Sequence, residues 1–189
     1  MSLTRLNHSL IRQHFAKHPE ALGMAVDATC GNGFDTLFLA ELGFRKVVGF
    51  DIQTAAIDAT RQRLHSAGHE EVPLYQQGHQ ELTTIIQQEV DCVMFNFGYL
   101  PGADKGITTL AESSVVAVQQ ATDLLSHAGV ISLMCYPGHA AGAEEKQLIE
   151  AWLNNLQDDP CWRMETHLSA TPSNTAPILF LLQRTVSEE

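Results

Sequence analysis

Short apolar segments alternate with helical patterns through most of this chain, and this alternation restricts its fold more than any other feature. Continuous apolar runs predict strands at residues 24–28, 46–50, 72–76, 90–95, 130–135, 162–168 and 178–183. Periodic apolar residues predict helices at residues 4–18, 35–43, 53–66, 82–86, 108–126 and 144–156. The alternation therefore predicts an α/β fold: a doubly wound, seven-stranded, mostly parallel sheet with helices on both faces and an extra N-terminal helix.

The composition is that of a single globular domain. The 189 residues are 44% hydrophobic and 17% charged, so residues 1–189 are expected to form one domain, with a helical extension at residues 1–20. We expect no membrane span and no signal peptide, because no apolar run is long enough and the N-terminus lacks an apolar core. The four cysteines are widely spaced, so no disulfide framework or metal site is expected, and a cytoplasmic location is favoured.

The charge distribution bears on nucleic-acid binding. The formal net charge is −11, which argues against indiscriminate nucleic-acid binding, because such binding depends on neutralising phosphates. Residues 1–19 are an exception, since they carry Arg5, Arg12, Lys17 and three histidines but no acid. Two interpretations of this segment remain open: an RNA-contacting helix, or an amphipathic helix with a solvated face.

A glycine turn follows the first expected strand, at the end of the sheet where doubly wound folds bind ligands. Glycines let the backbone approach a ligand closely, and free N–H groups at a helix start attract an electron-rich group. The pattern D-x-x-x-G-x-G is typical of enzymes that use S-adenosylmethionine (SAM), whereas dinucleotide-binding enzymes have a third glycine where this chain has Thr36. The predicted SAM-binding residues of the turn are Asp27, Gly31, Asn32, Gly33, Asp35 and Thr36.

The next two strands add candidates for the same cofactor. Asp51 ends the second expected strand, 24 residues after Asp27, and an acid there can bind both ribose hydroxyls or cap the following helix. Gln53 follows it in the same loop. Gly78 and His79 come after the third strand, where methyltransferases line the adenine pocket, although His79 is equally well explained as a solvated loop histidine.

The segment after the fourth strand predicts the chemistry. It reads Asn96-Phe97-Gly98-Tyr99, in the place of the N-P-P-Y motif of methyltransferases that act on amino nitrogens. Asn96 would contact SAM and align a neutral amine by accepting its N–H bonds, and Phe97 or Tyr99 would stack on a base, so that catalysis rests on proximity and orientation. Asn96 and Tyr99 are therefore candidate catalytic residues, and Phe97, Gly98 and Tyr99 are candidate substrate contacts. The alternative is a simple turn after a core strand.

A second polar cluster follows the fifth strand, at the same edge of the sheet. It contains Tyr136 and His139, both candidate substrate contacts. His139 is also a candidate general base, because imidazole exchanges protons near neutral pH. The alternative for His139 is a cap on the following helix.

Three motifs together make the chain resemble one bacterial family. They are Asp-Ala-Thr-x-Gly-Asn-Gly-x-Asp-Thr-x-Phe-Leu-Ala (27–40), Asn-Phe-Gly-Tyr-Leu-Pro-Gly-x-Asp-Lys (96–105) and Tyr-x-Gly-His-x-x-Gly-x-Glu-Glu (136–145). They resemble the class I SAM-dependent methyltransferases labelled rRNA methylases. Members are now understood as tRNA wobble-uridine methyltransferases, which convert 5-aminomethyl-2-thiouridine to its 5-methylaminomethyl form. Residues 170–177 depart from the family pattern, because they lack its Asn-Gln pair and one proline.

The resemblance implies a Rossmann-like domain, often dimeric, that uses SAM to methylate an exocyclic amine in the anticodon region of tRNA. It implies SAM contacts from the glycine turn, Asp51, the loop after the third strand and Asn96. The acceptor base would lie near residues 96–99 and 136–139. The alternatives are an rRNA or small-molecule amine methyltransferase, a non-catalytic SAM-binding module and, more distantly, an NAD-linked oxidoreductase.

Overall fold

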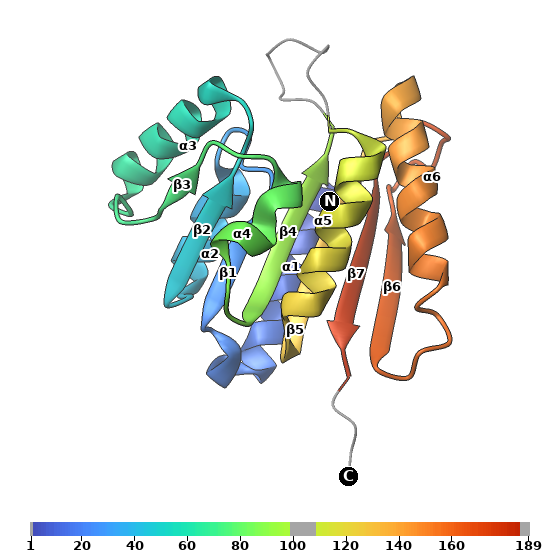
Figure 1. Ribbon diagram of the computed structural model, residues 1–189, viewed down its shortest axis with the longest axis horizontal. Helices are drawn as coiled ribbons and strands as arrows, with labels where there is room; N and C mark the ends of the chain where they lie inside the picture. The colour runs from blue at the N-terminus through green and yellow to red at the C-terminus, as the bar shows by residue number, and fades with distance from the viewer. Residues whose placement is uncertain (1, 99–108, 186–189) are drawn as a thin grey trace.

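The computed structural model describes residues 2–98 and 109–185, and its centre is one sheet in the order β3-β2-β1-β4-β5-β7-β6 (Figure 1). Strands β1 to β5 are parallel, and β7 runs antiparallel between β5 and β6. This arrangement confirms the predicted seven-stranded, mostly parallel sheet. The strands are β1 Met24–Asp27, β2 Lys46–Phe50, β3 Leu74–Tyr75, β4 Val90–Phe97, β5 Leu125–Cys135, β6 Trp162–Leu168 and β7 Ile178–Arg184.

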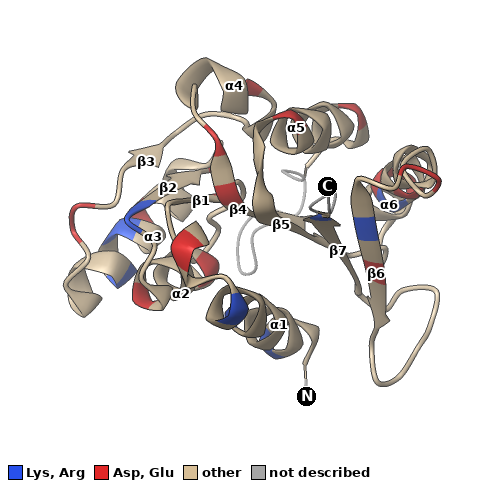
Figure 2. Ribbon diagram, turned by 90° about the horizontal axis from the view of Figure 1, so that it is seen from below, with Lys and Arg blue, Asp and Glu red and all other residues tan. Residues whose placement is uncertain are grey.

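Helices cover both faces of the sheet, as Figure 2 shows. Helices α1 and α2 pack on one face, and α4, α5 and α6 pack on the other. None of the described helices has both the length and the hydrophobicity needed to cross a bilayer. The helices are α1 Leu3–Lys17, α2 Phe34–Leu42, α3 Thr54–Ala67, α4 Leu82–Ile85, α5 Ala111–Leu124 and α6 Ala140–Asn154, with 3-10 turns η1 Pro19–Ala21 and η2 His79–Glu81.

The alternation of side chains along β4 decides which functional residues face which helices. Successive residues of a strand point to opposite faces of the sheet. Phe95 belongs to the core beneath α5 and α6, whereas Met94 belongs to the core beneath α1 and α2. The same alternation directs Asn96 toward α1 and α2, and Phe97 toward α5.

Several boundaries differ from the sequence-based expectations. β4 continues through Asn96 and Phe97, because these residues still pair with Met134 and Cys135 of β5. β5 begins at Leu125, which pairs with Val90 although a helix was expected to continue past it. β3 has only two residues. α6 begins at Ala140, earlier than expected, since a side chain caps it there.

Candidate active site

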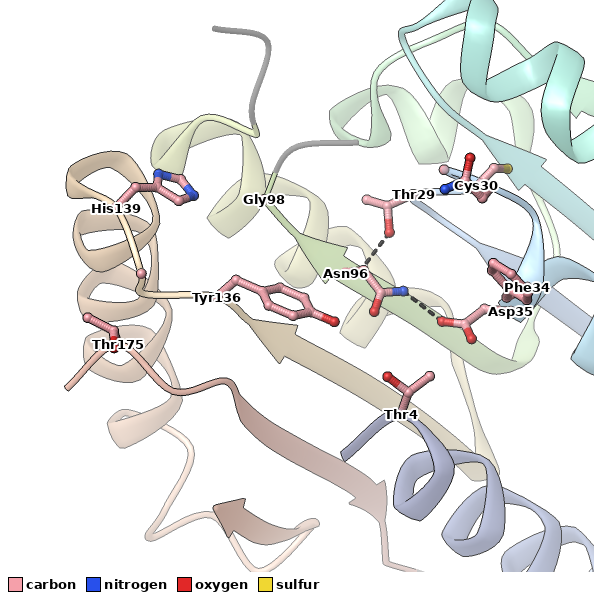
Figure 3. Close-up of a pocket in the computed structure, with 13 residues that line it drawn as sticks. Thr4, Thr29, Cys30, Phe34, Asp35, Asn96, Gly98, Tyr136, His139 and Thr175 are labelled. Carbon is pink, nitrogen blue, oxygen red and sulfur yellow. Dashed lines mark hydrogen bonds between the residues drawn. The ribbon is translucent and has the colours of Figure 1, made fainter. Parts of the chain in front are cut away.

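A cavity of about 770 Å³ opens at the carboxyl ends of β1, β4 and β5 (Figure 3). Residues from the first helix, the glycine turn, β4 and the segments after β5 and β6 meet there. Its volume falls in the range typical of cofactor sites. The described residues that line it are Thr4, Thr29, Cys30, Gly31, Asn32, Phe34, Asp35, Asn96, Gly98, Tyr136, Gly138, His139 and Thr175.

The glycine turn forms one wall of this cavity. Gly31 and Gly33 have φ values of 52° and 75°, a left-handed conformation that favours glycine. A Cβ on Gly33 would lie 2.8 Å from Cα of Thr60 in α3, so the turn is also too close to α3 for any side chain at this position. Gly33 precedes α2 directly, and no side chain caps the helix there. The turn therefore leaves backbone N–H groups available to a ligand.

Asp27 and Thr36 lie beneath the turn rather than in the cavity wall. Both are completely buried. The Asp27 carboxylate accepts a hydrogen bond from the Thr36 hydroxyl at 2.6 Å and one from the Thr29 N–H at 3.2 Å. Burial raises the pKa of Asp27 to about 7, and the negative charge of Asp35 adds to this shift. This corrects the expectation that Asp27 and Thr36 contact the cofactor: they hold the turn in shape.

Asp51 ties the turn to the end of β2. One of its carboxylate oxygens accepts from the Gly31 N–H and the other from the Gln53 N–H, each at 2.9 Å. Gln53 itself is the N-cap residue of α3, so the interpretation of Asp51 as that cap is wrong. Asp51 is half-exposed, but neither it nor Gln53 lines the cavity.

Asn96 is held at the centre of the cavity by two hydrogen bonds, drawn in Figure 3. Its backbone N–H donates to Oγ1 of Thr29, and its side-chain Nδ2 donates to Oδ2 of Asp35, both at 2.6 Å. The other carboxylate oxygen of Asp35 lies 2.5 Å from Nε2 of His8, in α1. Because a carboxylate only accepts hydrogen bonds, the Asn96 amide must present its nitrogen to Asp35. Its oxygen is therefore directed toward the remaining space of the cavity.

The wall opposite the turn comes from the segment between β5 and α6. The Tyr136 ring points into the cavity (Figure 3), and burial raises the pKa of its hydroxyl, with Asp35 adding to the shift. His139 lines the cavity and is also the N-cap of α6, because its Nδ1 accepts from the Gly142 N–H at 3.1 Å. The helix-cap interpretation of His139 is thus confirmed, and its placement at the cavity is compatible with the predicted substrate contact.

Phe97 does not offer the stacking surface that was expected of it. It is completely buried, because the alternation along β4 turns it toward α5. Its ring stacks on Phe95 with centroids 5.2 Å apart, and the edge of His79 meets it at 6.0 Å. The prediction of Phe97 as a substrate contact is therefore wrong. Tyr99, the other candidate, lies outside the described residues.

His79 is neither a cavity residue nor a solvated loop residue. It is buried against Phe95 and Phe97, and its Nε2 lies 3.4 Å from Oγ of Ser114. Burial lowers its pKa to about 4. Gly78 and His79 are absent from the described cavity wall, so the structure gives no support to their predicted adenine contacts.

The structure also adds residues that were not predicted. Thr29, Cys30 and Phe34 belong to the glycine turn, and its motif could have identified them. Thr4 and Thr175 come from segments far away in sequence, and no local pattern points to them. The same holds for His8, whose contact with Asp35 depends on how α1 packs on α2.

The chain is similar in sequence to a known protein family and to a named plant protein. The family described as "Putative rRNA methylase" matches residues 47–183. A relative from Arabidopsis thaliana, named tRNA (mnm(5)s(2)U34)-methyltransferase, chloroplastic, is 38% identical over 144 residues, which is 69% of this chain and 53% of the relative. The chain thus spans about half the length of that relative.

Solved structures resemble the whole fold. A protein from Clostridium thermocellum described as "putative rRNA-methylase" is 34% identical, with a TM-score of 0.89, over 97% of this chain and 98% of the other. A protein from Streptococcus mutans described as "a putative methyltransferase", solved in complex with S-adenosylhomocysteine (SAH), is 27% identical, with a TM-score of 0.82, over 96% of this chain and 97% of the other. Both therefore cover the glycine turn as well as β4 and β5.

Proposed function

This chain belongs to the rRNA methylase family, and from that premise we propose that it is a SAM-dependent N-methyltransferase acting on RNA. Its proposed substrate is the aminomethyl nitrogen of 5-aminomethyl-2-thiouridine at the wobble position of tRNA. The observation that carries the proposal is the Asn96 amide, which Asp35 orients across 2.6 Å within the same cavity as the glycine turn.

The residues present fit SAM. The turn can pack closely against α3 because Gly33 has no side chain, and the start of α2 offers N–H groups to the methionine part of SAM. Gly31, Asn32 and Asp35 would contact that part, and Asp51 would accept hydrogen bonds from the ribose. The structure of the S. mutans relative with SAH supports this assignment. SAM supplies an activated methyl group, so the protein needs only to bind and orient its reactants.

Asn96 would orient the methyl acceptor. Its amide oxygen faces the cavity and can accept an N–H bond from the substrate amine, which directs the nitrogen lone pair toward the methyl group. The two hydrogen bonds of Asn96 hold this oxygen in place before the substrate arrives. Alignment of this kind, and not acid–base strength, would be its contribution to catalysis. Tyr136 and His139 would contact the base from the opposite wall.

The assignment to tRNA rests on the name of the Arabidopsis relative and on the amine-directed geometry of Asn96. The anticodon region as the binding target, a homodimer and a cytoplasmic location remain predictions from the sequence. An rRNA substrate, or a small amine, is the alternative that shares the same chemistry. A non-catalytic SAM-binding module would have no use for the oriented Asn96 amide.

The direct test is methyl transfer from labelled SAM to tRNA isolated from a strain that lacks this gene. We expect label in 5-methylaminomethyl-2-thiouridine when the nucleosides are separated by mass spectrometry. Ribosomal RNA and free primary amines serve as competing substrates in the same assay. Label in rRNA alone, or in free amines alone, would reject the tRNA assignment. Binding of SAH without any methyl transfer would reject the proposal that the protein is an enzyme.

A further inference from the structure

His8 extends the cavity's hydrogen-bond network toward solvent. Its Nε2 lies 2.5 Å from Oδ1 of Asp35. The imidazole stacks on Phe38 with ring centroids 3.9 Å apart and planes inclined by only 4°. The side chain of Asp35 is 7% exposed and that of His8 is 23% exposed. One face of the pair therefore belongs to the cavity, and the other reaches the surface of α1.

Asp35 is the only carboxylate lining the cavity among the residues that the structure describes. Its two oxygens have different neighbours, since Oδ2 accepts from Asn96 and Oδ1 meets His8. A substrate amine aligned by Asn96 would therefore lie next to the one acidic group in the described cavity wall. Asp35 and then His8 would connect that amine with solvent.

The proposed reaction requires such a path. An alkylamine is largely protonated near neutral pH, and an ammonium group has no lone pair with which to attack a methyl group. One N–H bond must break before the new C–N bond forms and the C–S bond of SAM breaks. The product is a secondary ammonium ion, so each turnover releases one proton.

We propose that Asp35 and His8 accept this proton and conduct it to solvent. Asp35 takes it from the substrate ammonium and passes it to Nε2 of His8, in the tautomer that carries its hydrogen on Nδ1, and His8 then releases the Nδ1 proton at the surface. Asp35 would thus be a catalytic residue, and His8 would act through it. This inference rests on the proposed amine methylation. It assigns His8 a function beyond attaching α1 to α2.

Other charged groups also face this pair. On α1, Arg5 and Arg12 are three and four positions from His8, and the Arg12 guanidinium lies 5.4 Å from the Phe38 ring centre. The other titratable groups near Asp35 in the described part of the chain are Asp27 at the end of β1, Cys92 in β4 and Tyr136 after β5. The test must therefore remove the imidazole while leaving these groups unchanged.

His8→Gln does this, because its amide can still donate to Asp35 but cannot carry a proton. We expect kcat on tRNA to fall about 100-fold near pH 7, in the range typical of a lost general base. The loss should shrink as the pH rises toward 9, since the amine then deprotonates without help. His14→Gln is the matched control, because His14 lies on the same helix and bonds the Ala128 carbonyl rather than a cavity residue.

One further measurement separates proton transfer through His8 from a purely structural role in holding α1. Added imidazole should restore activity to His8→Gly at neutral pH. A loss of activity that is equal at all pH values, without rescue by imidazole, would overturn the relay and leave His8 as an anchor of α1. Wild-type protein that methylates no tRNA would instead reject the proposed function itself.

Discussion

The side chain of Asn96 donates a 2.6 Å hydrogen bond to Asp35, a residue 61 positions earlier in the chain. The bond joins the end of β4 to the start of α2. The two elements meet because β4 pairs with β1, which leads directly into the glycine turn. The acceptor-positioning amide is therefore attached to the wall that would hold the methyl donor.

Asn96 and Asp51 should affect different steps. Asn96→Ala should lower kcat about 100-fold, a typical cost of losing one oriented polar group, while the Kd for SAH changes only a few-fold. Asp51→Ala should instead weaken SAH binding, because it removes both the predicted ribose contact and the hydrogen bond to Gly31. Isothermal titration and steady-state kinetics on the same preparations measure both effects. Equal losses of SAH affinity in the two variants would contradict this division of roles.

Gly33 should tolerate substitution less than Gly43. Both residues have positive φ, 75° and 97°, so alanine at either costs about 1–2 kcal/mol of backbone strain. At Gly33 the new Cβ would also collide with Thr60, whereas at Gly43 nothing lies within 4 Å. We expect Gly33→Ala to lower the free energy of unfolding in urea further, and to weaken SAH binding, which Gly43→Ala should preserve. Equal destabilisation would show that the contact with α3 relaxes freely.

Asp27 should make the protein less stable as the pH rises. Its folded pKa of about 7 lies above its ordinary value of 3.8, so the unfolded chain gives up the proton first. Its stabilising contribution is complete below about pH 4 and is lost by about pH 7. The unfolding free energy of wild type should accordingly fall relative to Asp27→Asn across this window. The exposed Asp58→Asn is the control, and a constant difference between wild type and Asp27→Asn would contradict the shift.

His79 should make the protein less stable as the pH falls. Its folded pKa of about 4 lies below its ordinary value of 6.5, so the unfolded chain binds the proton first as the pH falls. Its contribution to stability is present above pH 6.5 and is lost on acidification toward pH 4. In urea denaturation, the free energy of unfolding of wild type should therefore fall relative to that of His79→Gln as the pH is lowered. The variant His65→Gln, at an exposed position, should show the same pH dependence as wild type. Parallel curves for wild type and His79→Gln would show that this site admits water or charge.

Substitution of the cationic residues of α1 tests whether this helix contacts RNA. Arg5 and Lys17 are exposed, and neither forms an ion pair within the described part of the chain. If they contact phosphates, Arg5→Gln and Lys17→Gln should each weaken tRNA binding and reduce the slope of log K against log salt by roughly 1. Arg61→Gln is the control, because Arg61 is already paired with Asp58. Unchanged slopes would favour the solvated-face interpretation.

Local patterns in the sequence predicted much of the fold. The parallel strands follow from apolar runs that alternate with helices, and α2 and α3 end at Gly43 and Gly68, close to the ends expected at residues 43 and 66. The pattern failed where pairing with a neighbour decides the boundary, as for Leu125 in β5. It also failed at Asn96 and Phe97, which lengthen β4 by pairing with β5 rather than by being part of an apolar run.

The site could be predicted only as far as the edge of the sheet. The first, fourth and fifth strands were expected to bring the glycine turn, Asn96 and His139 together, and the cavity does so. Extending the strand to residue 97 would have shown that Phe97 points away from Asn96. The contact of His8 with Asp35 had no such signal, because it depends on the position of a helix that precedes the sheet.

The antiparallel β7 has a consequence for how the chain folds during synthesis. Among the strands that the structure describes, β6 pairs only with β7, and β7 pairs with β5, so β6 cannot join the sheet until the residues of β7 have left the ribosome. A nascent chain arrested before Ile178 would therefore expose the open edge of β5 and a detached β6. Unpaired edges of this kind are prone to aggregate. Completion of the sheet must wait for translation to pass residue 184, and until then chaperones are the natural protection for that edge.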